Sequence, residues 1–319
     1  DLIFSSSLEL KCRVCGTSSD EEDIFCRSCR VRLLQSRRYD VNRLDYAYAA
    51  DLEKLALLKE LATPAALIKA FYLKKAVSML VKEVSDRSAL VERGSKLGSM
   101  LIKCADTLCL KYLPEMYVDG YVGFNAYSFG FDEKPYVVVG ERLLKVLTEE
   151  EMTALIAHEL GHIGCGHMLY HTLAEFIVQG VGWSASTLGI PLLETPLRLA
   201  LLSWRRESEV SADRASLLVA GSVEAVKSLL LKLTTLNKEV SCGDGVLGSL
   251  SEVVSSHPLV ARRIALLEEY YKSVGYAKAR SKISKRNLVR RAFVPICRFC
   301  GAKKPPSSLF CSSCGRSCV

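Results

Sequence analysis

Residues 148–162 of this 319-residue chain read TEEEMTALIAHELGH, and this stretch decides which fold to expect. Thr148 is followed three residues later by Glu151, an order typical of a capping box, in which each side chain binds the backbone N–H of the other residue. Such a box predicts a helix that begins at Glu149 and runs through about Gly164. The pattern His-Glu-x-x-His therefore lies in the second half of a helix.

This pattern consists of His158, Glu159 and His162. Residues four apart on a helix lie on one face, about one turn from each other, so the two histidines can bind one zinc ion. Glu159 then lies beside that ion, where its carboxylate can act as the general base toward an attacking water molecule. We therefore predict a catalytic zinc site, with a pair of exposed helix histidines as the structural alternative.

A catalytic zinc ion needs a third protein ligand. Glu209 is the preferred candidate, because it lies on a second predicted helix with Asp213 one turn later, where a carboxylate can orient a ligand histidine. Glu207 is the competitor, but the residue one turn after it is Ser211. Residues two apart on a helix point about 200° from each other, so only one of the two glutamates can face the metal.

His167 and His171 follow the motif closely and are further candidates. A metzincin would have glycine three residues after its second histidine and a third histidine six residues after it, but this chain has Cys165 and Met168 at those positions. The two histidines are therefore either functional or polar residues on a continuing helix.

Thirteen cysteines are present, and eight of them form four Cys-x-x-Cys pairs. The pairs make two modules, Cys12, Cys15, Cys26 and Cys29 in the first and Cys297, Cys300, Cys311 and Cys314 in the second. Four thiolates at this spacing typically bind one tetrahedral zinc ion, as in zinc ribbons, with redox-active pairs as the alternative. With the catalytic ion, the prediction is three zinc ions per chain. Metal-binding cysteines favour a reducing compartment, so we expect a cytoplasmic protein.

Charge is unevenly distributed along the chain. The net charge is +8, and the last fifty residues, from Tyr270 onward, hold 12 Lys or Arg and no Asp or Glu, so residues 1–269 carry 8 − 12 = −4. The basic run over 278–291 is either a solvated connector or a peripheral contact to an anionic membrane or another polyanion. Sequence-specific nucleic-acid binding is not expected, because neither a helix-turn-helix nor an aromatic platform accompanies the run.

The predicted fold is α+β and mostly helical. Its parts are an N-terminal zinc ribbon with a basic linker over 1–38, a zinc metallopeptidase domain over 39–277 with a helical lead-in over 39–113, and a basic connector with a C-terminal zinc ribbon over 278–319. Alternating β-formers between residues 114 and 139 predict a small antiparallel sheet. Pro135 marks Tyr136–Val139 as an edge strand, because proline cannot donate to a central ladder.

No convincing membrane-spanning helix is predicted. The longest weakly apolar run extends from Met168 to Leu193, but Glu175 and Pro191 interrupt it. A spanning helix needs about 20 predominantly apolar residues, so an integral membrane protein is not expected.

Several segments together resemble the HtpX-like and CAAX-prenyl-protease family of gluzincins. The segments are NAYS (125–128), YVVVGERLL (136–144), LTEEEM (147–152), HELGH (158–162), EVSAD (209–213), His257-Pro258 and Arg263-Ile264. They occur in one order over about residues 105–270. This chain lacks the long apolar helices that membrane members of the family carry before the catalytic motif.

The resemblance implies an α+β zinc metallopeptidase with further roles around the cleft. It places Asn125 and Ala126 near the cleft, and it implies that a peptide substrate pairs with the strand formed by Tyr136, Val137, Val138 and Val139. An edge strand can bind any extended backbone in this way. It also implies that His257 approaches the site and donates to the oxyanion, with helix capping or packing as the alternative for that histidine.

We therefore predict a zinc-dependent endopeptidase. One alternative is a ribbon-flanked adaptor that binds proteins, an anionic membrane surface or nucleic acid through its basic tail. An adaptor has no need of a general base beside the metal, and Glu159 is present. A second alternative, an exopeptidase, would need a group that captures a substrate terminus, and no such group is identified in the sequence.

Overall fold

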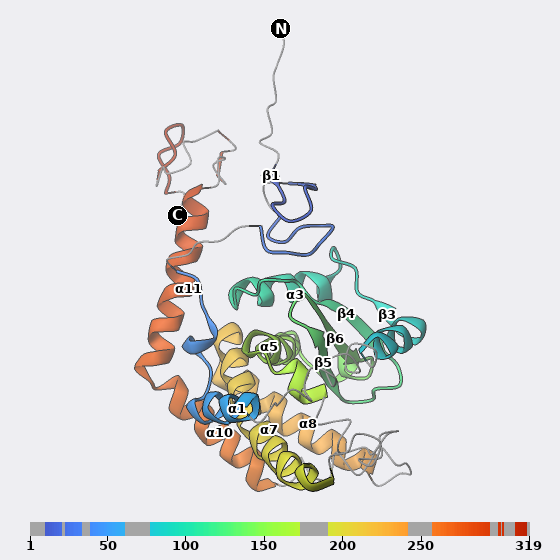
Figure 1. Ribbon diagram of the computed structural model, residues 1–319. Coiled ribbons are helices and arrows are strands. Elements are labelled where there is room, and N and C mark those ends of the chain that lie inside the picture. Colours follow the sequence, from blue (N-terminus) through green and yellow to red (C-terminus); the bar gives the residue numbers. More distant parts are fainter. Residues whose placement is uncertain are drawn as a thin grey trace.

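The computed structural model describes most of the chain. The described residues are 10–20, 23–33, 39–60, 77–172, 191–241, 257–293, 299–300, 302 and 310–317. Within these ranges, the side chains of residues 10, 191–198, 237–241, 257–259 and 289–293 are not described. A mostly helical body contains a small sheet, and the two cysteine modules lie toward one end of the molecule (Figure 1).

The helices largely follow the sequence pattern. They include α1 (Ala49–Glu60), α3 (Lys96–Thr107), α4 (Leu143–Val146), α5 (Glu149–Cys165), α7 (Pro191–Ala220), α8 (Val223–Ser241), α10 (His257–Tyr271), α11 (Val274–Phe293) and the 3-10 helix η1 (Arg43–Asp45). Residues 77–87 and 168–172 are also helical. The capping box predicted for α5 is confirmed: the Thr148 N–H donates to Glu151 Oε2 at 2.8 Å, and the Glu151 N–H donates to Thr148 Oγ1 at 3.2 Å. The helix ends at Gly166, whose φ of 75° suits glycine.

The sheet is mixed rather than antiparallel as predicted. Its strands are β3 (Ala89–Leu90), β4 (Glu115–Asp119), β5 (Ala126–Phe131) and β6 (Lys134–Gly140), in the order β3-β4-β6-β5. The β5–β6 hairpin turns back so that β6 inserts between β4 and β5. Because β6 then runs in the same direction as β4, this pair is parallel, while the other two pairs are antiparallel.

The prediction that Tyr136–Val139 is an edge strand is wrong. Those residues belong to β6, which is paired on both sides, and the side chains of Val137, Val138 and Val139 are fully buried. Pro135 is tolerated because pairing with β4 begins one residue later, at Tyr136, so no ladder bond to β4 is lost. Among the described strands, β5 forms the edge of the sheet that contacts α5.

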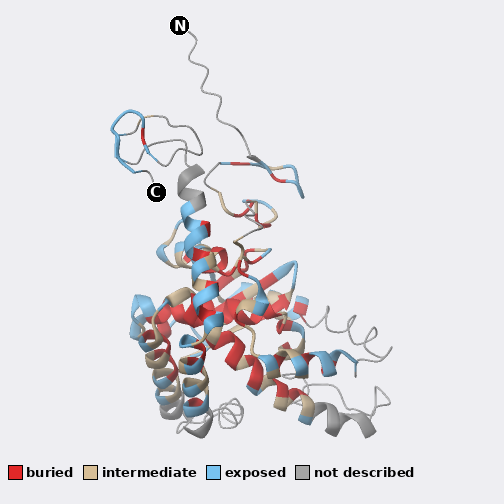
Figure 2. Ribbon diagram, turned by 90° about the vertical axis from the view of Figure 1, so that its left-hand side faces the viewer, coloured by how far each residue is buried: buried red, intermediate tan, exposed pale blue. Residues whose placement is uncertain are grey.

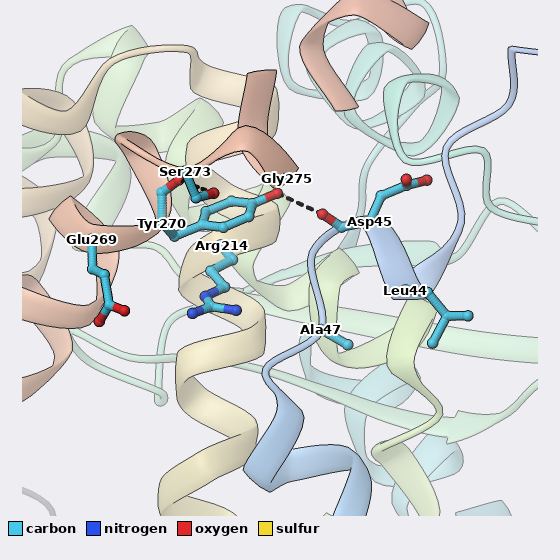
Figure 3. Close-up of a pocket in the computed structure, with 8 residues that line it drawn as sticks. All are labelled: Leu44, Asp45, Ala47, Arg214, Glu269, Tyr270, Ser273 and Gly275. Atoms are coloured by element: carbon cyan, nitrogen blue, oxygen red, sulfur yellow. Dashed lines mark hydrogen bonds between the residues drawn. The ribbon is translucent and has the colours of Figure 1, made fainter. Parts of the chain in front are cut away.

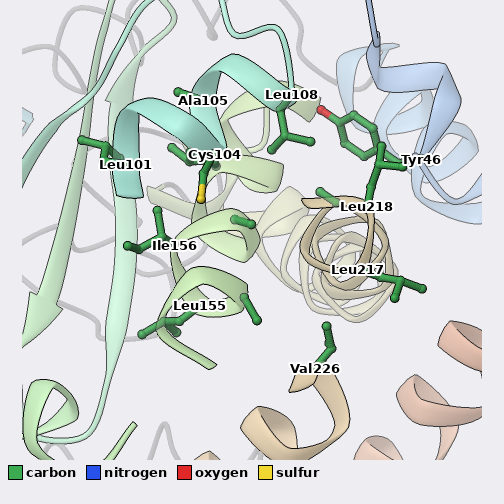
Figure 4. Close-up of a cluster of buried hydrophobic side chains, with 14 of the residues drawn as sticks. Tyr46, Leu101, Cys104, Ala105, Leu108, Leu155, Ile156, Leu217, Leu218 and Val226 are labelled. Carbon is green, nitrogen blue, oxygen red and sulfur yellow. The ribbon is translucent and has the colours of Figure 1, made fainter. Parts of the chain in front are cut away.

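The helix α5 runs through the main hydrophobic core (Figure 4). Leu155 and Ile156 of α5 lie in one cluster with Leu101 of α3, Leu217 of α7 and Val226 of α8. Figure 2 shows the buried residues concentrated in the middle of the body, where these helices meet the sheet. Each fully buried side chain of this size contributes about 1.5–3 kcal/mol, so packing fixes α5 in place.

Gly161, inside the His-Glu-x-x-His pattern, allows α7 to approach α5 closely. A Cβ atom at this position would lie 2.7 Å from Ala215 Cβ and 3.0 Å from Ala212 Cα, both on α7. Contacts that short do not occur between real side chains, so the two helices could not keep this spacing with a larger residue. The glycine thereby sets how near α7 comes to the histidines of α5.

The basic run over 278–291 lies within α11, which packs against η1 and α7. Lys282 Nζ lies 2.7 Å from Asp45 Oδ1 in η1, Arg280 donates to the Leu218 carbonyl at 3.0 Å, and the Arg286 side chain is 1% exposed. Some of the basic side chains of this run therefore form contacts within the protein.

A pocket of about 320 Å³ lies where η1 meets α7 and the α10–α11 corner (Figure 3). The Tyr270 hydroxyl donates to the Asp45 carbonyl at 2.7 Å across one side of it. The Arg214 guanidinium lies 4.9 Å from the Tyr48 ring centroid and 4.8 Å from that of Tyr270. These contacts join the lead-in segment to the body, and none of the pocket's lining residues belongs to the histidine cluster described below.

Within the part of the chain that the structure describes, no helix is both long and apolar enough to cross a membrane. Most of the run from Met168 to Leu193 lies outside the described residues.

Candidate metal and catalytic site

The helices α5 and α7 bring together the three residues predicted as ligands of the catalytic metal. His158 Nε2 lies 3.4 Å from Glu209 Oε2, and His162 Nε2 lies 3.5 Å from Glu209 Oε1. One ligand atom from each residue lies within 4.8 Å of the other two. Two imidazoles and one carboxylate at this separation are a donor set that a zinc ion can bridge while keeping an open position.

Asp213 and Arg263 support this cluster from behind. His158 Nδ1 lies 3.1 Å from Asp213 Oδ1, so the carboxylate can hold that imidazole with Nε2 toward Glu209. Arg263 of α10 donates from Nε to Asp213 Oδ2 at 2.7 Å, and its Nη1 lies 3.2 Å from Glu209 Oε2. One guanidinium therefore holds the carboxylates of Glu209 and Asp213.

The charged groups shift each other's pKa values. Burial alone would raise the pKa of Glu209, but Arg263 and the hydrogen bonds with His158 and His162 outweigh it and hold that pKa well below its ordinary value. Burial would lower the pKa of His158, but its hydrogen bonds with Asp213 and Glu209 raise it to about 10. Since metals bind only unprotonated imidazole, metal binding here would release a proton from His158.

Glu159 has the environment expected of a proton carrier. Its side chain is buried, and burial raises its pKa, against the opposing effects of the charge on His158 and a hydrogen bond with Ser128 of β5. A carboxyl group whose pKa is raised toward neutrality can both accept and return a proton at ordinary pH. The contact with Ser128 places this carboxyl beside the sheet edge.

The charge of the cluster fits a divalent cation. Glu159, Glu209 and Asp213 contribute three carboxylates, and Arg263 is the one guanidinium that contacts them among the described residues. With neutral imidazoles and ionised carboxylates, the cluster carries 1 − 3 = −2. Buried charges in proteins are paired or bind metals, so a doubly charged zinc ion would balance this group.

Glu207, the competing candidate, lies away from the histidines. Its Oε1 lies 3.0 Å from Lys54 Nζ, and its Oε2 lies 2.8 Å from Arg262 Nη2. These two ion pairs occupy both of its carboxylate oxygens. The opposite directions of the two glutamates follow from their separation of two positions on α7.

The two remaining described histidines lie close behind His162. His162 Nδ1 is 3.0 Å from His167 Nδ1, and His167 Nε2 is 2.9 Å from Asp51 Oδ2 in α1. His171 packs its ring 4.6 Å from that of His162, and its Nε2 lies 3.0 Å from Ser208 Oγ. Both residues are therefore internal contacts of the site.

The first cysteine module gathers its four sulfur atoms at one point. Cys12 Sγ lies 3.5 Å from Cys29 Sγ, and Cys15 Sγ lies 3.5 Å from Cys26 Sγ, with all four within 4.8 Å of one another. In the second module, the sulfur atoms of Cys300, Cys311 and Cys314 also lie within 4.8 Å of one another. The fourth cysteine, Cys297, lies outside the described residues. None of the described cysteines of the two modules forms a disulfide, so each cluster could hold a metal ion.

The first module is attached firmly to the body. The Arg32 N–H donates to the Lys111 carbonyl at 2.8 Å, and the Arg32 guanidinium forms an ion pair with Asp106. Arg30 Nε donates to the Leu113 carbonyl at 2.8 Å. These contacts connect the first cysteine module to the segment that leads into β4.

The other predicted site residues are placed less directly. Asn125 immediately precedes β5, and Ala126 begins that strand. Tyr136 to Val139 lie one strand further in, as described above. The side chain of His257 lies outside the described part of the structure, so its role at the oxyanion stays a prediction.

Sequence reasoning did not assign Arg263, Ser128 or Asp51 to the site. Arg263 and Ser128 belong to segments that carry the family resemblance, and this was a signal that could have marked them as candidate site residues. Asp51 gave no signal, because it is one of many acidic residues in a helical segment more than a hundred positions before the motif.

Comparison with known proteins covers most of the folded body. The profile of peptidase family M48 matches residues 92–271. A plastoglobule-localized metallopeptidase 48 of Arabidopsis thaliana is 27% identical over 276 residues, covering 79% of this chain and 79% of that protein. Protease HtpX homologs of Nostoc punctiforme and Variovorax paradoxus are 29% and 26% identical, covering 49% and 45% of this chain and 66% and 61% of those proteins.

Proposed function

Because this chain belongs to peptidase family M48, we propose that it is a zinc-dependent endopeptidase that hydrolyses internal peptide bonds of proteins. The family match and the names of its relatives support a metalloprotease. The observation that carries the finer proposal is the convergence of His158, His162 and Glu209, with Glu159 one residue away on the same helix. The test is zinc-dependent cleavage of a peptide whose two ends are blocked.

In this proposal, His158, His162 and Glu209 hold the zinc ion. Bound zinc supplies Lewis-acid chemistry, acidifying water and polarising the peptide carbonyl. Glu159 takes a proton from the water that attacks the carbonyl carbon and then delivers it to the leaving amine. Asp213 and Arg263 keep His158 and Glu209 in position, and His257 donates to the oxyanion.

We propose that the substrate pairs with β5 instead of β6. The Gly140 N–H donates to the Asn125 carbonyl at 2.9 Å, so Asn125 and Gly140 face each other as a hydrogen-bonded pair of the hairpin. In an antiparallel ladder, hydrogen-bonded residue pairs alternate with pairs that are not hydrogen-bonded. The next hydrogen-bonded pair in this register is therefore Tyr127 with Val138. The backbone groups of Ala126 and Ser128 then point outward, where an extended peptide could bind them beside Glu159.

Backbone methylation of a cleaved peptide is expected to reveal this pairing. Substrate N–H groups that bind β5 should alternate along the peptide, because only every second residue of an added strand faces the sheet. N-methylation at such a position removes one hydrogen bond worth about 1 kcal/mol, or about five-fold in kcat/KM. Methylation at the intervening positions is the matched control and should have little effect. A scan of kcat/KM without this alternation would contradict β5 pairing.

The two cysteine modules are proposed to bind one structural zinc ion each, which with the catalytic ion makes three per chain. Segments this small lack a core of their own, so metal binding would supply their folding energy. The contacts of Arg30 and Arg32 with the body suggest that the first module also steadies the approach to β4. A cytoplasmic location and a peripheral contact through residues 278–291 stay predictions.

A further inference from the structure

The second proposed zinc ligand, His162, is connected to a buried carboxylate through another histidine. His162 Nδ1 contacts His167 Nδ1 at 3.0 Å, and His167 Nε2 contacts Asp51 Oδ2 at 2.9 Å. All three side chains are buried, His167 and Asp51 completely. The contact reaches from α5 to α1, which lies outside the 92–271 segment matched by the family profile.

Asp51 is built to stay ionised in this position. It accepts hydrogen bonds from Trp204 Nε1 at 2.8 Å and from Ser211 Oγ at 2.6 Å, besides its contact with His167. Burial would raise its pKa, but these three partners outweigh burial and lower it. Asp51 also lies in the first turn of α1, where the helix N-terminus favours negative charge.

An ionised Asp51 determines where the protons of both imidazoles must lie. A carboxylate only accepts, so His167 must carry its proton on Nε2. Because a neutral imidazole carries one proton, His167 Nδ1 then has a lone pair that accepts the hydrogen bond from His162, 3.0 Å away. His162 must then carry its proton on Nδ1. With a metal bound, Nε2 would offer its lone pair to the ion, and this is the atom that lies 3.5 Å from Glu209 Oε1.

We propose that Asp51 and His167 are positioning residues, which hold His162 in the Nδ1–H tautomer and so prepare Nε2 to bind the metal. The inference rests on the proposed zinc site and deepens it. Asp213 does the same for His158 through a direct contact of 3.1 Å. The two histidine ligands thus have separate carboxylate supports, one from α7 and one from the lead-in segment.

A second metal ion among these histidines is the competing interpretation. His162, His167 and His171 lie close enough for one, and so do Asp51, Cys165 and His167. His171 already bonds Ser208 through Nε2, and His167 and Asp51 already bond each other through Nε2 and Oδ2. The hydrogen-bonded chain accounts for the same contacts without another ion.

The test compares full-length Asp51→Asn with the wild type. Asp51 accepts at both oxygens, from Trp204 at Oδ1 and from Ser211 and His167 at Oδ2, so an asparagine must turn its NH2 group toward one of these donors and the ionised acceptor of His167 is lost either way. Loss of such outer support typically weakens metal affinity about 10- to 100-fold, and competition with a chelator should show this for the catalytic ion. The ions of the cysteine modules should keep their affinity. Ser216→Ala is the control, because Ser216 Oγ of α7 donates to the Ala154 carbonyl of α5 at 2.7 Å without touching a histidine.

A conservative pair of variants separates positioning from packing. His167→Asn places an amide oxygen near the former Nδ1 and keeps an acceptor for His162, whereas His167→Ala removes it. We expect His167→Asn to retain more zinc affinity than His167→Ala. Equal losses in the two variants would contradict a hydrogen-bonding role for His167.

Nitrogen-15 NMR of the histidine rings tests the proton positions without any variant. In the zinc-loaded wild type, His162 should carry its proton on Nδ1 and His167 on Nε2. The opposite tautomers, unchanged zinc affinity in folded Asp51→Asn, or a fourth zinc ion per chain would each overturn the inference while leaving the proposed function standing. A wild type that binds no zinc through His158, His162 and Glu209 would instead refute the proposed function.

Discussion

Glu159→Gln is expected to lose peptide hydrolysis by about 10²–10⁴-fold while the protein keeps its catalytic zinc ion. Glutamine has nearly the same shape but accepts no proton at neutral pH, so the attacking water keeps its proton and the leaving amine receives none. Glu159 is not one of the three ligands, and its buried carboxyl forms a hydrogen bond with Ser128. Kinetics on a cleavable peptide, combined with elemental analysis, would measure both effects.

Glu149→Gln is the matched control for this variant. It changes the same functional group on the same helix, but the Glu149 side chain is 73% exposed and pairs with Lys96 at the surface. Its activity should equal that of the wild type. Substantial turnover by zinc-loaded Glu159→Gln would refute the assignment of the base, whatever the metal does.

Glu209→Ala is expected to empty the catalytic site, so that zinc content falls from three ions per chain to two and hydrolysis is lost. The variant removes the only carboxylate among the three proposed ligands and leaves two imidazoles, which is too few for a stable site. Glu207→Ala, two residues away, should retain three ions, because Glu207 binds Lys54 and Arg262 instead. Elemental analysis of the two variants beside the wild type makes the comparison.

The two variants, Glu209→Ala and Glu207→Ala, also show which glutamate binds the metal. If Glu207→Ala lost the ion and Glu209→Ala kept it, the register of ligands along α7 would be wrong. Fewer than three ions in fully loaded wild type would remove the catalytic ion or one of the two cysteine sites from the proposal. Removing Cys12 or Cys311 as well would identify which module had been miscounted.

Local patterns in the sequence predicted the helix α5 and the face that carries His158 and His162, because capping and helical periodicity depend only on neighbouring residues. Preference for Glu209 over Glu207 rested on the same periodicity, and the structure places Glu209 at the histidines. These features needed no knowledge of the tertiary fold.

Strand order could not be predicted in the same way. Pro135 suggested an edge strand, but whether a strand is an edge depends on which segment pairs with its far side, and β4 does so beginning just after the proline. The role of Asp51 was also hidden, because only packing of α1 against α7 brings it to His167. Contacts between distant segments decide both, and no local pattern records them.

The most direct measurement of the central claim is hydrolysis of a peptide with a blocked amino end and a blocked carboxyl end by the full-length protein. Metal-free protein, the same protein after zinc is restored, and zinc-loaded Glu159→Gln would be compared, with products identified by mass spectrometry. We predict cleavage at internal bonds only in the zinc-restored wild type. No cleavage of any tested sequence by protein with a filled catalytic site, or equal cleavage by Glu159→Gln, would contradict a zinc endopeptidase built on His158, His162 and Glu209.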